Sequence, residues 1–480
     1  MEGYFIDIHC HPTMRTMHNA AHTKNPNHWE ENFNDVIDSG VARWASKTSD
    51  RIAKKSQSNF NHCISGKVRV VFDSLYPLER GFVNLRKLPE RIIGLKNAET
   101  IIVTSAGLSK KQFRKYRSSQ DYFKELEEQY DFLIKNQGPS PCGNYSYKVV
   151  NNNLELEEWL SAEKGNIAIV VTIEGAHVFG CGTSLSENLD TDELGEKIIE
   201  NIRIVKAWKH PPFFVTFAHH FWNQLCGHAA TFPISTRITC NQNPGLNTGF
   251  TELGKKIMTS LLSKENGKRI LLDTRHMSAQ SRIEYYNYIK DYNQNNPKDP
   301  IPIISSHSAV NGYGTMAKSM KTMDNASKKK RTPFCSWSLN VSKEEAQIIH
   351  RSGGIVGIIL DKGRHSGTNK LKQIDSLSEL SLKKEAFIQL ILDNIFFYID
   401  AIGEMSAWDM LTLGTDFDGV ITHFDCYENM SKMPELKNDL INYLNRTKYR
   451  DELWYSYTPE EIFDKIFYSN AKQFLAKHFI

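Results

Sequence analysis

Near its start the chain reads Tyr4-Phe5-Ile6-Asp7-Ile8-His9-Cys10-His11-Pro12, a short apolar segment that runs into two histidines and a proline. Its β-branched and aromatic residues predict a buried strand over residues 4–8, which Pro12 brings to an end. Because alternate residues of an extended chain point the same way, His9 and His11 can present two imidazoles to one point. Such a pair suits zinc or a similar transition metal. Two surface histidines would give the same pattern, so the metal hypothesis requires further ligands elsewhere.

The overall composition is that of an ordinary globular enzyme. The chain has 480 residues, of which 40% are hydrophobic and 24% charged, and its net charge is +4. This near balance gives no electrostatic reason to expect nucleic acid or an anionic membrane as a partner. The one basic run, residues 328–331, is short enough to be a solvated loop. No apolar run is long enough to predict a membrane span.

The cysteines and the first residues bear on the compartment. The eight cysteines are scattered and none forms a close C-x-x-C pair, which favours free thiols in a reducing compartment. The first predicted strand begins at Tyr4, which leaves no room in this chain for a signal peptide. We therefore expect a cytoplasmic protein, the alternative being that a leader has been removed.

Seven further apolar segments predict strands, and each of the last six is followed by polar residues. They are residues 67–75, 166–173, 213–217, 269–274, 301–305, 354–360 and 410–415. Helical spacing predicts helices between most of them, at residues 193–208, 251–263, 278–291, 342–351 and 382–402. Strand alternating with helix eight times indicates an α/β protein with a (β/α)8 barrel of the TIM type. A long doubly wound sheet is the alternative.

The remaining segments are expected to be insertions into this barrel. We expect a single barrel domain over residues 1–480, with long insertions near residues 13–66, 76–160, 315–338 and 361–380. Residues 137–146, Gln-Gly-Pro-Ser-Pro-Cys-Gly-Asn-Tyr-Ser, have the composition of a turn. Two helix starts carry a capping box, Ser342 with Glu345 and Thr458 with Glu461.

Six of the eight predicted strands are followed by residues that can bind metals or transfer protons. These residues are His9 and His11, Glu174, His219, His276, His307 and Asp416. Catalytic residues of such barrels come from the C-terminal ends of several strands, so we expect these side chains to meet at one mouth. Each has an ordinary explanation alone: a lone histidine is usually a satisfied polar residue, Glu174 can cap a helix, and Asp416 suits a turn. Those explanations leave the repeated placement unaccounted for.

A carboxylate shared between two cations suits this set of residues. We expect the first metal ion to be held by His9, His11 and Glu174, and the second by Glu174, His276 and His307. Two divalent ions, with Zn²⁺ as the expected metal, can share a water and lower its pKa, which gives a bridging hydroxide near neutral pH.

Two further strand-end residues can handle protons and charge. Asp416 is expected to accept the proton of the attacking water and pass it to the leaving group, with binding of the first metal as an additional role. His219 is expected to donate to the oxyanion of a tetrahedral intermediate. His177, His220, His228 and Asp418 are weaker candidates that would support the site from outside.

Several segments along the chain carry a family resemblance. Among them are Ile173-Glu174-Gly175-Ala176-His177, Leu272-Asp273-Thr274-Arg275-His276-Met277-Ser278, Pro302-Ile303-Ile304-Ser305-Ser306-His307-Ser308 and Leu413-Gly414-Thr415-Asp416-Phe417-Asp418-Gly419. In this order they resemble the membrane (renal) dipeptidases, peptidase family M19 of the amidohydrolase superfamily. The resemblance implies a binuclear zinc dipeptidase barrel that acts on a small-molecule substrate. It also implies a homodimer, because dimers are common in that family.

Position by position, the resemblance implies the same roles for most of these residues. It implies that His9, Glu174, His276 and His307 are metal ligands. It implies that His219 contacts the substrate carbonyl or the intermediate, and that Asp416 is the acid/base.

Two positions depart from the family. The family has His-x-Asp after its first strand, whereas this chain has His11 at the second position. The family also has an arginine just before an asparagine that holds the substrate carboxylate, whereas here Leu339 precedes Asn340. Arg331 is the expected substitute for that arginine. Hydrolysis is therefore better supported than dipeptide specificity.

The expected function is metal-dependent hydrolysis of an amide bond, in a dipeptide or a similar small molecule. One alternative is another amidohydrolase-type reaction on a non-peptide small molecule. Another is a barrel that binds a ligand without turning it over. The charge pattern supports neither a structural role nor nucleic-acid binding.

Overall fold

Eight parallel strands close into a barrel in a computed structural model that describes residues 3–18, 26–31, 55–83, 108–119, 121–162, 165–232, 240–320 and 333–480. The barrel strands are β1 (Phe5–Cys10), β2 (Val68–Leu75), β5 (Ile167–Glu174), β6 (Phe214–Thr216), β7 (Leu271–Asp273), β8 (Ile304–Ser308), β9 (Ile355–Ile358) and β10 (Leu411–Leu413). Pairing of β2 with β5 and of β1 with β10 closes the ring. This confirms the predicted (β/α)8 barrel and rules out the doubly wound sheet.

Strands β1 and β8 run further than predicted, and both extensions carry a histidine. β1 continues through His9 to Cys10, which pairs with Asp73 of β2. β8 continues through His307 to Ser308, which pairs with Ile358 of β9. Because these two histidines lie within paired strands, the sheet itself fixes their backbone.

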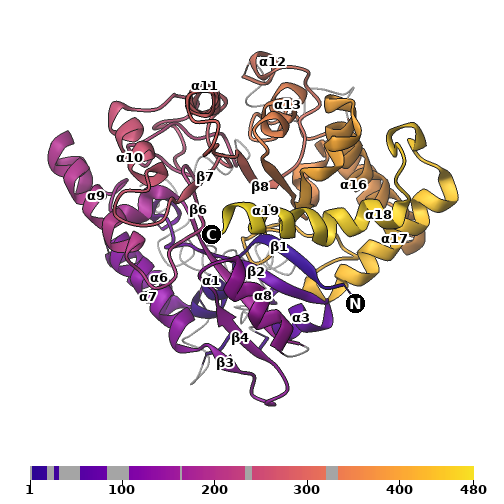
Figure 1. Ribbon diagram of the computed structural model, residues 1–480, viewed down its shortest axis with the longest axis horizontal. Helices are drawn as coiled ribbons and strands as arrows, with labels where there is room; N and C mark the ends of the chain where they lie inside the picture. Colours follow the sequence, from indigo (N-terminus) through magenta and orange to yellow (C-terminus); the bar gives the residue numbers. More distant parts are fainter. Residues whose placement is uncertain are drawn as a thin grey trace, which may run out of the picture.

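Helices surround the barrel (Figure 1). They are α1 (Pro12–His18), α3 (Phe60–Ser65), α6 (Lys110–Ser118), α7 (Tyr122–Lys135), α8 (Asn153–Ala162), α9 (Thr191–Lys206), α10 (Glu252–Leu262), α11 (Ala279–Asn295), α12 (Met316–Met320), α13 (Lys343–Arg351), α14 (Lys362–His365), α15 (Thr368–Asp375), α16 (Leu380–Ile402), α17 (Met433–Thr447), α18 (Pro459–Asp464) and α19 (Asn470–His478). The five predicted helices are α9, α10, α11, α13 and α16, and both predicted capping boxes form. Within the described ranges, none of the helices combines the length and apolarity needed to cross a membrane.

The predicted turn at residues 137–146 is part of a hairpin. β3 (Gly138–Pro139) pairs antiparallel with β4 (Ser146–Val149), and β4 in turn pairs with β5. β4 was not predicted, because an alternating pattern of only four residues beside so many turn-forming residues is too short to indicate a strand. The insertions predicted near residues 13–66, 76–160 and 315–338 lie partly outside the described residues.

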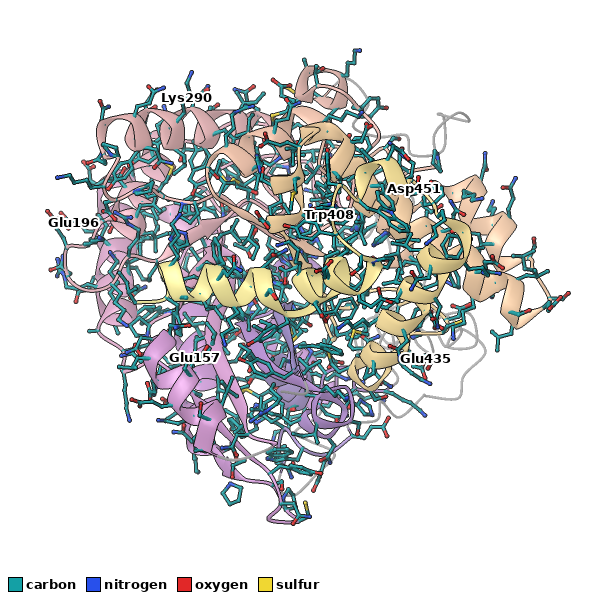
Figure 2. The ribbon with its side chains drawn as sticks, turned by 45° about the vertical axis from the view of Figure 1, so that its right-hand side comes forward. Glu157, Glu196, Lys290, Trp408, Glu435 and Asp451 are labelled. Atoms are coloured by element: carbon teal, nitrogen blue, oxygen red, sulfur yellow. The ribbon has the colours of Figure 1, made fainter. Side chains whose placement is uncertain are left out.

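The C-terminal helices cover the N-terminal end of the barrel. The π-helical turn η8 (Lys465–Ser469) joins α18 to α19, and this yellow run of helix crosses the view in both Figure 1 and Figure 2. Phe467 packs edge-on against Phe5 at the start of β1, with ring centroids 5.1 Å apart. The Asn470 side chain donates to the carbonyls of Trp408, which Figure 2 labels, and of Leu411, both at 2.7 Å. The C-terminal ends of the strands meet at the opposite end of the barrel, which these helices leave uncovered.

Strand β8 bulges into the barrel at Ser306, and two glycines make room for the bulge. The pairing register of β8 with β9 shifts between Ser305 and Ser308. A Cβ atom on either Gly357 or Gly414 would lie 1.8 Å from the Ser306 carbonyl oxygen. No side chain fits at either position, so the glycines determine how far the Ser306 backbone can enter the barrel.

We expect Gly414→Ala to destabilise the protein, because the new methyl group would push the Ser306 carbonyl out of place. Overpacking of this kind costs about 1–3 kcal/mol of the free energy of unfolding. Gly314→Ala is the matched control, since nothing lies within 4 Å of a Cβ there. Denaturant unfolding of the two variants checks this. Equal midpoints for Gly414→Ala and the control would show that the close approach is dispensable.

Candidate metal centre

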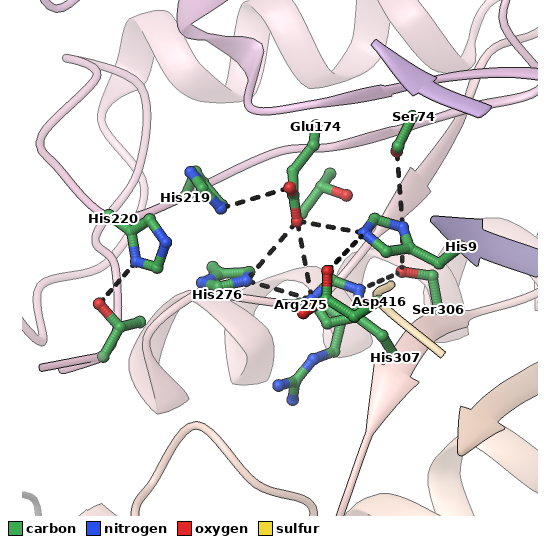
Figure 3. Close-up of polar contacts among 12 residues, drawn as sticks. His9, Ser74, Glu174, His219, His220, Arg275, His276, Ser306, His307 and Asp416 are labelled. Carbon is green, nitrogen blue, oxygen red and sulfur yellow. Dashed lines mark hydrogen bonds and ion pairs between the residues drawn. The ribbon is translucent and has the colours of Figure 1, made fainter. Parts of the chain in front are cut away.

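The polar residues at the strand ends converge on Glu174, the last residue of β5 (Figure 3). The structure brings together His9, His11, Glu174, His219, His276, His307 and Asp416, each at most 8% exposed. Three of them occupy the same place relative to a strand: His219, His276 and Asp416 each lie three residues beyond the end of β6, β7 and β10. Arg331 lies outside the described residues.

One group of ligand atoms consists of His9, His11 and Glu174. The Nε2 atom of His11 lies 3.1 Å from Glu174 Oε2, and that of His9 lies 3.4 Å from Glu174 Oε1. Asp416 Oδ1 faces both imidazoles, at 3.7 Å from His9 Nε2 and 3.5 Å from His11 Nε2. Asp416 therefore borders the same small space from the β10 side.

A second group consists of Glu174, His276 and His307. Glu174 Oε1 lies 3.7 Å from His276 Nε2 and 3.6 Å from His307 Nε2. The two imidazole Nε2 atoms are 3.2 Å apart. In both groups the ligand atoms lie within 4.8 Å of one another, and Glu174 belongs to both.

The donor atoms in these groups fit divalent cations. His9 Nε2 and His11 Nε2 are buried and have no hydrogen-bond partner. Buried polar atoms are rarely left in this state without a ligand. Zinc ligands at about 2.1 Å in tetrahedral geometry lie about 3.4 Å from each other, which is close to the separations seen here. Imidazole and carboxylate ligands suit zinc and related transition metals.

The charges at the site also suit cations. Burial alone would raise the pKa of Glu174, but His219, His9 and His11 hold it well below its usual range, so Glu174 is a carboxylate. Burial, reinforced by neighbouring imidazoles, lowers the pKa of His276 well below its ordinary value, which keeps it in the neutral form that binds metals.

His11 is the exception among the imidazoles. Burial lowers its pKa, but Glu174 and Asp416 together raise it well above the ordinary value. Its Nδ1–H donates to the Ser74 carbonyl at 2.9 Å, which directs Nε2 toward Glu174. A cation bound at Nε2 would take the place of the proton that the two carboxylates otherwise hold there.

Two site residues have a backbone conformation that L-residues rarely adopt. The φ angle is +63° at His276 and +61° at Asp416. Such positions persist only where the surrounding structure enforces them, and they cluster at functional sites. Gly419 leaves room for the Asp416 side chain, because a Cβ atom on residue 419 would lie 2.0 Å from Asp416 Oδ1. Backbone strain of this kind leaves no mark in sequence periodicity.

Glu79 is a buried residue that the sequence analysis missed. It follows β2, and its Oε2 atom accepts the His219 Nδ1–H at 2.6 Å. Its two oxygens also accept the backbone N–H groups of His220 and Phe221, at 3.2 and 3.0 Å. Burial would raise the pKa of Glu79, but His219 lowers it to about 2. Glu79 could have been predicted as a site residue from its place in the sequence, because it follows the predicted strand 67–75 as Glu174 follows the predicted strand 166–173.

The weaker candidates divide into two kinds. His177 and His228 donate to backbone carbonyls, and Asp418 accepts the backbone N–H groups of Gln57 and Ser58, so these three tie loops together. His220 differs, because its ring lies with those of His219 and His276 in a further group of potential ligands.

Solved structures share this fold at low sequence identity. A dipeptidase of metallopeptidase family M19 is 14% identical, with a TM-score of 0.51 over 99% of this chain and 98% of its own. A metallopeptidase from Rhodobacter sphaeroides, solved with a phosphinate mimic of the dipeptide L-Ala-D-Ala, is 13% identical with a TM-score of 0.50 over 99% of both chains. A probable dipeptidase from Pseudomonas aeruginosa is 14% identical, with a TM-score of 0.50 over 91% of this chain and 98% of its own. No protein-family model matches the chain, and no curated protein matches its sequence.

The pH dependence of stability tests the Glu79 contact. Because folding lowers the pKa of Glu79 from 4.5 to about 2, its carboxylate stabilises the protein above pH 4.5, and this contribution is lost as the pH falls toward 2. We expect Glu79→Gln to remove about 3 kcal/mol at neutral pH and to flatten the stability curve over that pH window. Glu158→Gln, at an exposed position on α8, is the control. Parallel curves for Glu79→Gln and the wild type would contradict the assignment.

Proposed function

We propose that this chain is a metal-dependent hydrolase that cleaves the amide bond of a dipeptide or a similar small molecule. The observation that carries the proposal is the pair of ligand groups that share Glu174 at the C-terminal ends of the barrel strands. The fold shared with an M19 dipeptidase supports it, as does the fold shared with a metallopeptidase that was solved with a dipeptide mimic.

Two divalent cations, which we propose to be Zn²⁺, would be held by five residues. These are His9, His11, Glu174, His276 and His307. When bound, such a pair of cations supplies an activated water and polarises the scissile carbonyl.

Asp416 is the proposed acid/base. Its Oδ1 atom faces the Nε2 atoms of His9 and His11 from the β10 side, so it reaches the space that the first ligand group encloses. It can accept a proton from the attacking water at this oxygen and return it to the leaving amine. Its backbone N–H donates to the carbonyl of His9 at 2.9 Å, which anchors it to β1.

His219 is the proposed donor to the developing oxyanion. Glu79 holds its Nδ1 at 2.6 Å, and its Nε2 lies 3.4 Å from Glu174 Oε2. The ring is therefore fixed with Nε2 directed into the site. The flanking carboxylates Glu174 and Glu79 outweigh the effect of burial and raise the pKa of His219, which favours the protonated form needed for donation.

A substrate carboxylate needs a positively charged side chain as its partner. This chain has Leu339 where the resembling family has an arginine for that purpose. Leu339 is buried, and its carbonyl accepts from Arg275 at 2.6 Å. Arg331 remains a proposed contact. Arg364 is a second candidate, because its guanidinium donates to the carbonyl of Thr231, whose hydroxyl lies 2.7 Å from His220 Nδ1.

We expect Asp416→Asn to lose most turnover, about 10²- to 10⁴-fold, while it keeps its metal ions. Asparagine tolerates the left-handed backbone that this position requires, so the fold should survive. The measurement is hydrolysis of a panel of L-L and L-D dipeptides by Zn²⁺-loaded protein, with metal content determined on the same samples. Asp451→Asn, at an exposed position in the short 3-10 helix Asp451–Leu453, is the control.

The outcomes of this panel separate the candidate functions. Wild-type kcat in Asp416→Asn would contradict the acid/base assignment. Bound metal without dipeptide turnover would direct the search to other amides, consistent with His11 and Leu339 marking a different substrate. A protein that binds no divalent metal would instead be a ligand-binding barrel without this activity.

A further inference from the structure

Ser306 lies within the barrel between two of the proposed ligands. It is fully buried on β8, at the bulge that Gly357 and Gly414 make room for. Its Oγ atom lies 2.9 Å from Nδ1 of His307 and 3.3 Å from Nδ1 of His9 (Figure 3). His9 belongs to the first ligand group and His307 to the second. One hydroxyl therefore touches the outer ring nitrogen of a ligand from each group.

The direction of the Ser306 hydroxyl proton is set by Asp273. Ser306 Oγ donates to Asp273 Oδ2 at 2.6 Å. The same carboxylate accepts from the Thr216 hydroxyl at 2.7 Å and from the backbone N–H groups of Ser306 and Arg275, at 3.0 and 3.2 Å. Asp273 is thus surrounded by donors and acts as the acceptor in each contact.

A serine hydroxyl has one proton to donate and two lone pairs that can accept. With its proton on Asp273, Ser306 can only accept from the two histidines. For both contacts to be hydrogen bonds, His307 Nδ1 and His9 Nδ1 must each carry a hydrogen, which leaves the Nε2 atom of each neutral ring without one. Those are the atoms that face Glu174, at 3.6 and 3.4 Å. Ser74 Oγ is a second and longer contact of His9 Nδ1, at 3.5 Å.

We propose that Ser306, oriented by Asp273, is a positioning residue shared by both metal sites, and that its hydroxyl holds His9 and His307 in the tautomer that binds cations. This inference rests on the proposed metal centre. Contacts of this type to the outer nitrogen of a ligating histidine fix the ring and raise its basicity. Because a single oxygen contacts one ligand of each group, one substitution should weaken the binding of both ions.

Ser306→Ala removes the shared acceptor with a minimal change of shape. We expect Zn²⁺ affinity to fall about 10- to 100-fold at both sites, the range typical for loss of such a contact. Ser305→Ala is the matched control, because Ser305 is a buried serine on the same strand. Its hydroxyl bonds Ser308 at 2.5 Å and forms no hydrogen bond to a histidine among the described residues. Both variants lose one buried hydroxyl. A difference in Zn²⁺ affinity between them would therefore come from the contacts of Ser306 with the two histidines.

Asp273→Asn provides a second variant of nearly the same shape. The amide oxygen must face the two backbone N–H groups, so the amide nitrogen would donate to Ser306. The Ser306 proton would then turn toward a histidine and force a hydrogen onto that ring's Nε2 atom. We expect loss of metal affinity comparable to that in Ser306→Ala.

The experiment is titration of the metal-free full-length proteins with Zn²⁺ in competition with a chelator, which resolves two binding equivalents. Thermal unfolding of the same metal-free samples shows whether each variant is folded. ¹⁵N spectra of histidine-labelled protein report the tautomers directly, and we expect the Nδ1–H signals of His9 and His307 to change in Ser306→Ala.

Several outcomes would overturn the inference. Zn²⁺ affinities of Ser306→Ala equal to those of Ser305→Ala would do so, and so would weakening of one ion alone. Failure of the wild type to bind two Zn²⁺ ions would instead contradict the proposed metal centre, so the two failures are distinguishable.

Discussion

Five imidazole nitrogens lie 3.1–3.7 Å from the carboxylate oxygens of Glu174, and the arrangement of the barrel mouth depends on this crowding. A single buried carboxylate cannot form good hydrogen bonds with so many rings at once, and several of the rings are neutral. Divalent cations bound between the rings and the carboxylate, as we propose, would make this close packing favourable. Burial then becomes an advantage, because a low-dielectric surrounding strengthens each contact between Glu174 and a cation. The same burial excludes bulk water from the space in which a substrate bond would be broken.

Much of this site could be predicted from the sequence because parallel strands in a barrel end at one rim. Once eight strands had been identified, His9, Glu174, His276 and His307 had to approach one another, whatever the details of side-chain packing. Residues whose roles depend on packing could not be predicted from the sequence in this way. Glu79 acts through a loop after β2, and Ser306 acts through a bulge that exists only because two distant glycines admit it. Hydrophobic periodicity describes which face of an element is buried, and it carries no information about such contacts.

His11 gives the site an imidazole where the His-x-Asp pattern of the resembling dipeptidase family would give a carboxylate. With imidazoles at His9 and His11, the first ligand group contains one carboxylate, which it shares with the second group. Two divalent cations would therefore face less negative charge than in a His-x-Asp arrangement, and Asp416 becomes the nearest additional source of it. Burial lowers the pKa of His11, but Glu174 and Asp416 raise it well above the ordinary value because both favour a proton on its Nε2 atom. Metal choice and the acidity of a bound water both respond to such a change.

The barrel is closed by contacts between the two ends of the chain. The Asp7 carboxylate on β1 accepts the backbone N–H of Thr415 at 3.0 Å and its hydroxyl at 2.5 Å, across a sequence separation of 408 residues. During synthesis on the ribosome at about 5–20 residues per second, the first strand would wait roughly 20–80 s for its last neighbour to emerge. His9 lies on β1 and Asp416 three residues beyond β10, so this half of the site is assembled only after β10 has been translated. In the meantime the edge of β1 that later pairs with β10 stays unpaired, with His9 and His11 beside it, and an unpaired edge of this kind is a template for pairing with another chain.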